Sequence, residues 1–100
     1  MNEVVCHAIP DDNVLQDGDI VKVDLVMFVR GFHGDTTRTF ECGNVDEKGK
    51  RLIRTTKESL DKAIAVCKPG ANFWEIGKVI EEHAMKNGFD VYFIYKLYNE

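Results

Sequence analysis

The chain has 100 residues, of which 44% are hydrophobic and 30% are charged, and this composition excludes a disordered or collagen-like chain. The formal net charge of -4 and the absence of a long apolar run argue against nucleic acid and membrane partners. Three cysteines without a C-x-x-C pair argue against a disulfide framework or a thiolate zinc site, and they indicate a reducing compartment, the cytoplasm.

The first part of the chain is predicted to form β-strands. The run EVVCHAI, Glu3 to Ile9, is rich in β-branched residues and stops at Pro10, which predicts a strand followed by a turn. Ile20 to Val29 is apolar or β-prone almost throughout, and after Arg30-Gly31 a second β-prone run continues from Phe32 to Phe40. This pattern predicts an antiparallel hairpin that turns at Arg30-Gly31.

Two amphipathic helices are predicted after the hairpin. Asn44 is the expected N-cap of a helix that runs to about Lys68, because apolar residues recur there at steps of three and four. The expected apolar face of this helix comprises Ile53, Thr56, Leu60, Ala63, Ile64 and Cys67. Pro69-Gly70 ends the helix, and Asn72 is the expected N-cap of a second one that is closed by Gly88. Its expected apolar face comprises Phe73, Ile76, Ile80 and Ala84.

Two aspartates fall within the predicted hairpin. Asp24 lies inside an apolar run that predicts burial on both faces, where a carboxylate costs several kcal/mol unless a cation meets it. With a two-residue turn, Asp24 pairs with Thr37 and Asp35 pairs with Val26, so the two carboxylates share one face as diagonal neighbours. A three-residue turn would move Asp35 to the other face. Spacing alone leaves two interpretations open, a metal site and a pair of ordinary surface and turn residues.

Several motifs in their order resemble those of the type I methionine aminopeptidases. They are NEVVCHAIPDD, LQDGDIVKVDL, GFHGDTTRTF, KPG and the NGF at residues 87 to 89. The resemblance implies an α+β fold of the pita-bread type, of which this chain is the first half, an antiparallel hairpin plus two helices. It also implies metal-dependent removal of the N-terminal methionine from peptides and nascent proteins, and association of the full-length protein with the ribosome.

The same resemblance implies roles for three residues. Asp24 corresponds to a bidentate ligand of one metal ion and Asp35 to a carboxylate that bridges two ions, which would be Co, Mn, Fe or Zn. His7 corresponds to the catalytic histidine that hydrogen-bonds the substrate near the scissile peptide. His33, Thr36 and Thr37 are expected to orient Asp35 or to serve only as strand residues.

The sequence departs from the family pattern in three places. Ala8 stands where a glycine is expected and would strain a backbone of positive φ, and Val26 stands where a threonine is usual. No GHG-containing segment with its metal-binding histidine follows the NGF, so residues 1–100 are expected to form a partial catalytic domain that is inactive alone. The alternatives are a non-catalytic pita-bread relative that binds proteins and a truncated product with neither role. The intact Asp24 and Asp35 favour the enzyme.

The last run, FDVYFIYKLY, predicts a strand that follows the second helix. Val91 to Tyr98 combines high β-propensity with one charge and no proline, which is typical of an aggregation-prone edge. We therefore expect the isolated chain to self-associate through this segment.

Overall fold

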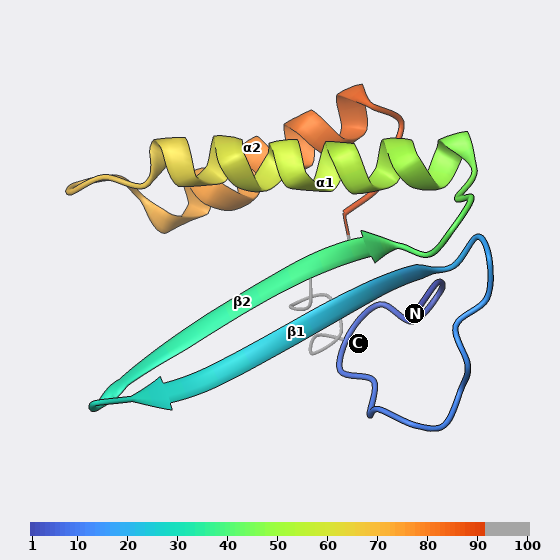
Figure 1. Ribbon diagram of the computed structural model, residues 1–100. Helices are drawn as coiled ribbons and strands as arrows, with labels where there is room; N and C mark the ends of the chain where they lie inside the picture. Colours follow the sequence, from blue (N-terminus) through green and yellow to red (C-terminus); the bar gives the residue numbers. More distant parts are fainter. Residues whose placement is uncertain (92–100) are drawn as a thin grey trace, which may run out of the picture. The chain divides into compact units, whose positions relative to one another are not determined.

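The computed structural model describes residues 1–91, which form two strands followed by two helices (Figure 1). The elements are β1 (Ile20–Val29), β2 (Phe32–Glu41), α1 (Glu47–Val66) and α2 (Phe73–Lys86). The chain divides into two compact units, Met1–Lys50 and Arg51–Glu100, and the boundary falls near the start of α1. The predicted strand FDVYFIYKLY and the predicted edge Val91 to Tyr98 lie, apart from their first residues, outside the described part of the chain.

The hairpin forms as predicted, and its turn has two residues. β1 and β2 pair in an antiparallel register that runs from Ile20 opposite Glu41 to Val29 opposite Phe32. Arg30 and Gly31 between them have φ values of 52° and 88°. Positive φ at both central residues is the requirement of a type I′ turn, whose twist matches that of the two strands. The long strands contact each other along their whole length (Figure 1).

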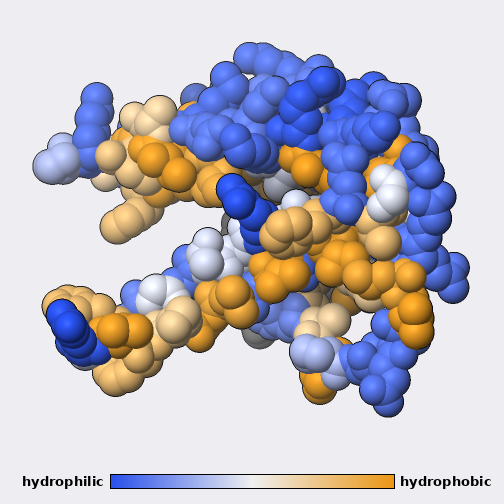
Figure 2. All heavy atoms as spheres, in the orientation of Figure 1, coloured by the Kyte–Doolittle hydropathy of each residue, from blue (hydrophilic) through white to orange (hydrophobic). Residues whose placement is uncertain are grey.

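The register gives the hairpin two chemically different faces. Because successive side chains alternate, one face, here called the polar face, carries Lys22, Asp24, Val26, Phe28, His33, Asp35, Thr37 and Thr39. The other is here called the apolar face, because all the side chains that β1 places on it are hydrophobic. They are Val21, Val23, Leu25, Met27 and Val29. The rings of Phe28 and His33, opposite each other on the polar face, have centroids 4.7 Å apart. Hydrophobic side chains are visible over much of the hairpin (Figure 2).

The expectation that Asp24 is buried on both faces is wrong. Asp24 is exposed, and so are Val26 beside it on the polar face and Leu25 and Met27 on the apolar face. The apolar run is shared between the two faces, because its successive side chains alternate, and neither face is buried around Asp24. The carboxylate therefore remains in contact with water, and it carries no desolvation cost that would demand a cation.

The predicted strand Glu3 to Ile9 does not form. The segment has no regular secondary structure, and His7 within it has a φ of 59°, which extended backbone does not adopt. The expected positive φ at Ala8 is likewise absent, because the left-handed residue is its neighbour His7. Local β-propensity therefore gave way to a bend at the histidine.

Asn2 attaches the N-terminal segment to the start of β1. Its backbone N–H donates to the carbonyl of Ile20 over 3.1 Å, and its side-chain oxygen accepts from the N–H of Ile20 over 3.0 Å. Its side-chain amide donates to the Asp19 carboxylate over 2.9 Å, and the N–H of Gln16 donates to the other oxygen of Asp19 over 2.9 Å. These contacts hold the chain end beside the hairpin.

A second polar contact closes the base of the hairpin, and it removes Asn44 from its predicted role as N-cap. The N–H of Asn44 donates to Asp17 Oδ1 over 2.7 Å. Asp46 is the residue that caps α1, because its carboxylate accepts from the N–H of Gly49 over 2.6 Å. The helix therefore begins at Glu47. It ends at Val66, slightly before the predicted Lys68.

The side chains that the two helices bury are small. α1 buries Thr55, Ser59 and Ala63, whereas the predicted face residues Leu60 and Ile64 are more than half exposed. On α2 the structure buries Ala84, and the predicted face residue Phe73 is 91% exposed.

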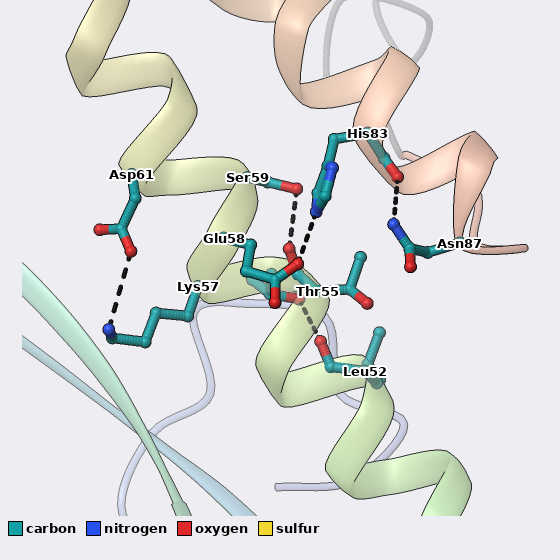
Figure 3. A network of polar contacts seen from close by, with 9 residues as sticks. Leu52, Thr55, Lys57, Glu58, Ser59, Asp61, His83 and Asn87 are labelled. Carbon is teal, nitrogen blue, oxygen red and sulfur yellow. Dashed lines mark hydrogen bonds and ion pairs between the residues drawn. The ribbon is translucent and has the colours of Figure 1, made fainter.

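A polar contact joins the two helices of this unit. The His83 ring lies 2.9 Å from the Glu58 carboxylate, while Lys57 pairs with Asp61 over 3.7 Å on α1 (Figure 3). Figure 2 shows mostly polar side chains over the helices on the visible face. Neither helix is long and apolar enough to span a bilayer, a statement that covers residues 1–91.

α2 ends in a Schellman motif at the predicted glycine. The N–H of Gly88 donates to Met85 and that of Phe89 to Ala84, both over 3.0 Å, and Gly88 has a φ of 75°. Asn72 stands at the predicted N-cap position of α2, although its side chain makes no capping hydrogen bond. The Phe89 ring lies 5.1 Å from the guanidinium of Arg51.

We predict that Gly43→Ala destabilises the hairpin base. Gly43 has a φ of 65°, and a Cβ added there would lie 1.8 Å from Asp17 Oδ1, so strain and collision act together. The expected loss in the free energy of unfolding is about 2 kcal/mol or more, measured by urea denaturation. Gly34→Ala is the matched control, because a Cβ there meets nothing within 4 Å. Equal midpoints for the two variants would contradict this account.

We also predict a pH dependence that originates at Asp19. The N–H of Gln16 and the side-chain amide of Asn2 hold the pKa of this carboxyl below its usual value. The resulting stabilisation is present above the usual pKa of about 4, and it is lost as the pH falls through the lower folded value. Asp19→Asn should therefore show a smaller loss of urea stability between pH 5 and pH 2.5 than the parent chain. Asp12→Asn, at an exposed position, is the control, and an unchanged pH profile for Asp19→Asn would count against this origin.

Candidate metal centre

The hairpin brings Asp24 and Asp35 to one face, as predicted for a two-residue turn. Asp24 lies opposite Thr37, and Asp35 lies opposite Val26, so the aspartates are diagonal neighbours on the polar face. Diagonal neighbours have Cα atoms about 7–8 Å apart, within reach of two carboxylates that bind a common ion or adjacent ions. The part of the prediction that depended on turn parity is therefore confirmed.

Thr37 holds one of the two carboxylates. Its hydroxyl donates a hydrogen bond of 2.8 Å to Asp24 Oδ1 across the strands. The sequence left open whether Thr36 and Thr37 orient Asp35 or serve only as strand residues, and the register gives them different places. Thr37 serves Asp24, and Thr36 lies opposite Leu25 on the apolar face. Strand parity was the signal that would have identified the correct partner.

His7 reaches the neighbourhood of the hairpin through a contact that the sequence did not reveal. Lys22, which shares the polar face with Asp24, donates a hydrogen bond of 2.5 Å from Nζ to the carbonyl of Val5. Because His7 follows Val5 by two residues, this bond and the Asn2 contacts hold the histidine segment beside the strand that carries Asp24. The positive φ of His7 lies within that segment.

The donor set is chemically suited to hard or borderline divalent ions, and within residues 1–91 it is small. Carboxylate oxygens are the ligands that Mg, Mn and similar ions prefer, and both carboxylates are exposed to solvent from which an ion can enter. No three side chains of His, Cys, Asp or Glu within these residues converge as a complete set of ligands. His33 lies on the polar face two residues before Asp35, and its ring lies tilted against that of Phe28. The two aspartates fit part of a metal centre.

Comparisons with known proteins agree with this geometry. The model of metallopeptidase family M24 matches residues 1–97. Methionine aminopeptidase 1D, chloroplastic/mitochondrial, of Arabidopsis thaliana is 54% identical over 91 residues, which are 91% of this chain and 26% of that protein. Methionine aminopeptidase 1 of Dictyostelium discoideum is 48% identical over 91% of this chain and 25% of its own length. The chain thus spans about a quarter of the length of these relatives.

A solved structure shares the fold. The methionine aminopeptidase of Rickettsia prowazekii superposes with a TM-score of 0.83 at 42% sequence identity, covering 87% of this chain and 35% of that one. The α+β, pita-bread fold predicted from the sequence is confirmed by this likeness together with the observed hairpin and helices.

We predict that Lys22→Met loosens the histidine segment without unfolding the hairpin. Methionine keeps the aliphatic stem and removes the ammonium that bonds to Val5. Backbone order parameters from ¹⁵N relaxation should fall below about 0.6 at Cys6 and His7, while β1 stays near 0.85. Arg38→Met, which changes an exposed cation on the apolar face, is the control. Rigid Cys6 and His7 in Lys22→Met would refute the role of this bond.

Proposed function

Because the chain belongs to metallopeptidase family M24, we propose that it takes part in removing the N-terminal methionine from peptides and nascent proteins. The observation that carries the proposal is the pair Asp24 and Asp35 on one face of a hairpin of fixed register. Identities of 48–54% to proteins named methionine aminopeptidase support it. The activity is proposed for the whole protein, of which these residues contribute one part of the site.

Asp24 and Asp35 are the residues proposed to hold two divalent ions, which would be Co, Mn, Fe or Zn. Both carboxylates would contribute oxygen ligands to these ions, and membership of a metallopeptidase family is the support. When bound, such ions lower the pKa of a shared water and polarise the scissile carbonyl. Two negative charges on one open face also favour the approach of cations before any ligand bond forms.

His7 is proposed to hydrogen-bond the substrate peptide. A neutral imidazole offers one donor and one acceptor, so it can hold a peptide group while the carboxylates face the reacting carbonyl. Lys22 and Asn2 keep the segment of His7 beside β1, and this placement is consistent with such a role. The substrate would begin with methionine followed by a small residue, and it would be met in the cytoplasm.

We predict that the 100-residue chain by itself releases no measurable methionine from such peptides, even with added Mn²⁺ or Co²⁺. A divalent transition metal takes about four to six ligands, and residues 1–91 bring together two carboxylates. The measurement is methionine release from a Met-Ala-Ser peptide. Turnover that Asp24→Asn abolishes in this chain would contradict the prediction.

The proposed activity itself is best tested in a chimera. Residues 1–91 replace the matching segment of the Rickettsia aminopeptidase, a graft that the TM-score of 0.83 supports. The chimera should release methionine, and Asp24→Asn or Asp35→Asn should lower kcat/KM by at least about 100-fold. Asp61→Asn on α1, whose carboxylate pairs with Lys57, is the matched control and should leave the rate unchanged. A folded chimera that is inactive with Mn²⁺ and with Co²⁺ would refute the proposed function.

A further inference from the structure

We propose that Thr37 is a positioning residue that presets the Asp24 carboxylate for a divalent cation. The proposal deepens the proposed function and rests on it, because it takes Asp24 to be a ligand. Its basis is the hydrogen bond of 2.8 Å from the Thr37 hydroxyl to Asp24 Oδ1. The two residues lie directly opposite each other in the register, so the bond links a side chain of β1 to one of β2.

The geometry explains why this hydroxyl orients the carboxylate. An exposed aspartate on a strand samples several rotamers, and an ion that binds it must select one of them. Threonine is branched at Cβ and therefore stiff at χ1, so its hydroxyl is a fixed point on the partner strand. The hydroxyl has one hydrogen, and Oδ1 receives it. The carboxylate keeps its remaining lone pairs, all of those on Oδ2 included, for a cation.

Asp35 lacks a cross-strand hydrogen bond of this kind, so the orienting effect of Thr37 is specific to Asp24. Its cross-strand neighbour is Val26, which has no polar side-chain atom, and the structure records no side-chain hydrogen bond to Asp35 from another residue of 1–91. Asp24 is thus preset, and Asp35 must be ordered when the ion binds. Groups that fix a metal ligand in this way typically change metal affinity by about 10–100-fold.

The competing explanation is a purely structural one. Cross-strand polar pairs stabilise sheets by themselves, and the bond between Thr37 and Asp24 could do only that. A structural role would change hairpin stability in proportion to any change in affinity. A positioning role changes metal affinity and the rotamer of Asp24 while the fold persists, and serine restores both because it keeps the hydroxyl.

The test measures Mn²⁺ binding to the 100-residue chain by electron paramagnetic resonance, in which free hydrated Mn²⁺ gives the signal. Thr37→Val removes the hydroxyl and keeps the shape, and it should raise the dissociation constant about 10-fold. Thr37→Ser should stay within about 2-fold of the parent chain, because it can still donate to Asp24. Thr36→Val is the matched control on the apolar face and should have no effect. Circular dichroism and urea midpoints establish that each variant is folded.

Asp24→Asn separates this inference from the function on which it rests. If Asp24→Asn weakens Mn²⁺ binding and Thr37→Val does not, the Thr37 inference is overturned and the ligand role of Asp24 stands. If the chain binds no Mn²⁺, or binds it equally with Asp24→Asn, the ligand role fails and the inference fails with it. A loss of affinity in Thr37→Ser as large as in Thr37→Val would also overturn the positioning role.

A second measurement needs no metal. Scalar couplings between Hα and Hβ report the χ1 rotamer of Asp24 by nuclear magnetic resonance. We expect one dominant rotamer in the parent chain and in Thr37→Ser, and averaged couplings in Thr37→Val. Averaged couplings in the parent chain would overturn the proposal. Couplings of Asp35 should be the same in all three chains, since Thr37 lies opposite Asp24.

Discussion

The two-residue turn at Arg30-Gly31 is the constraint on which the candidate site depends. Side chains alternate along a strand, so a shift of one residue in the pairing would move Asp35 to the face opposite Asp24. Positive φ at both turn residues selects the tight connection and excludes that shift. Arg30 adopts this conformation although it carries a Cβ, and Gly31 does so without steric cost. The functional geometry therefore begins in a turn that contributes no ligand.

Polar contacts, more than a large core, hold the N-terminal unit in place around this hairpin. Asn2 makes two hydrogen bonds with Ile20 and one with Asp19, and Asp17 accepts from Asn44 at the other side of the base. Most of these contacts are exposed, and each such bond contributes only about 0.5–1.5 kcal/mol. The unit is consequently expected to depend on many small contributions. In the helical unit the buried side chains are also small, Thr55, Ser59, Ala63 and Ala84.

The site combines a rigid part with an adjustable one. Asp24 and Asp35 stand on paired strands, whereas His7 belongs to an irregular segment tethered through Lys22. Ligands on regular elements are placed more precisely than groups on loops.

The amino-acid sequence by itself determined the hairpin and both helices, because these follow from local signals, and the structure then decided between the two registers that the sequence left open. Arg30-Gly31 specifies its turn, Pro69-Gly70 separates the helices, and Gly88 ends the second one. The shared face of Asp24 and Asp35 follows from the two-residue turn, and the resemblance to the family rests on short motifs in a fixed order between residues 2 and 89.

Tertiary structure alone decided the features that depend on distant partners. Asp17 accepts a hydrogen bond from Asn44, 27 residues away, and Asp46 takes the N-cap position of α1 instead of Asn44. Contacts of Asn2 and Lys22 replace the strand expected at Glu3 to Ile9. Thr37 bonds Asp24, 13 residues away, because cross-strand proximity outweighs nearness in sequence. Local propensity determines the bounds of a helix or strand to within about one turn. The hydrogen-bond partner of a polar side chain depends instead on which strand or loop folds beside it.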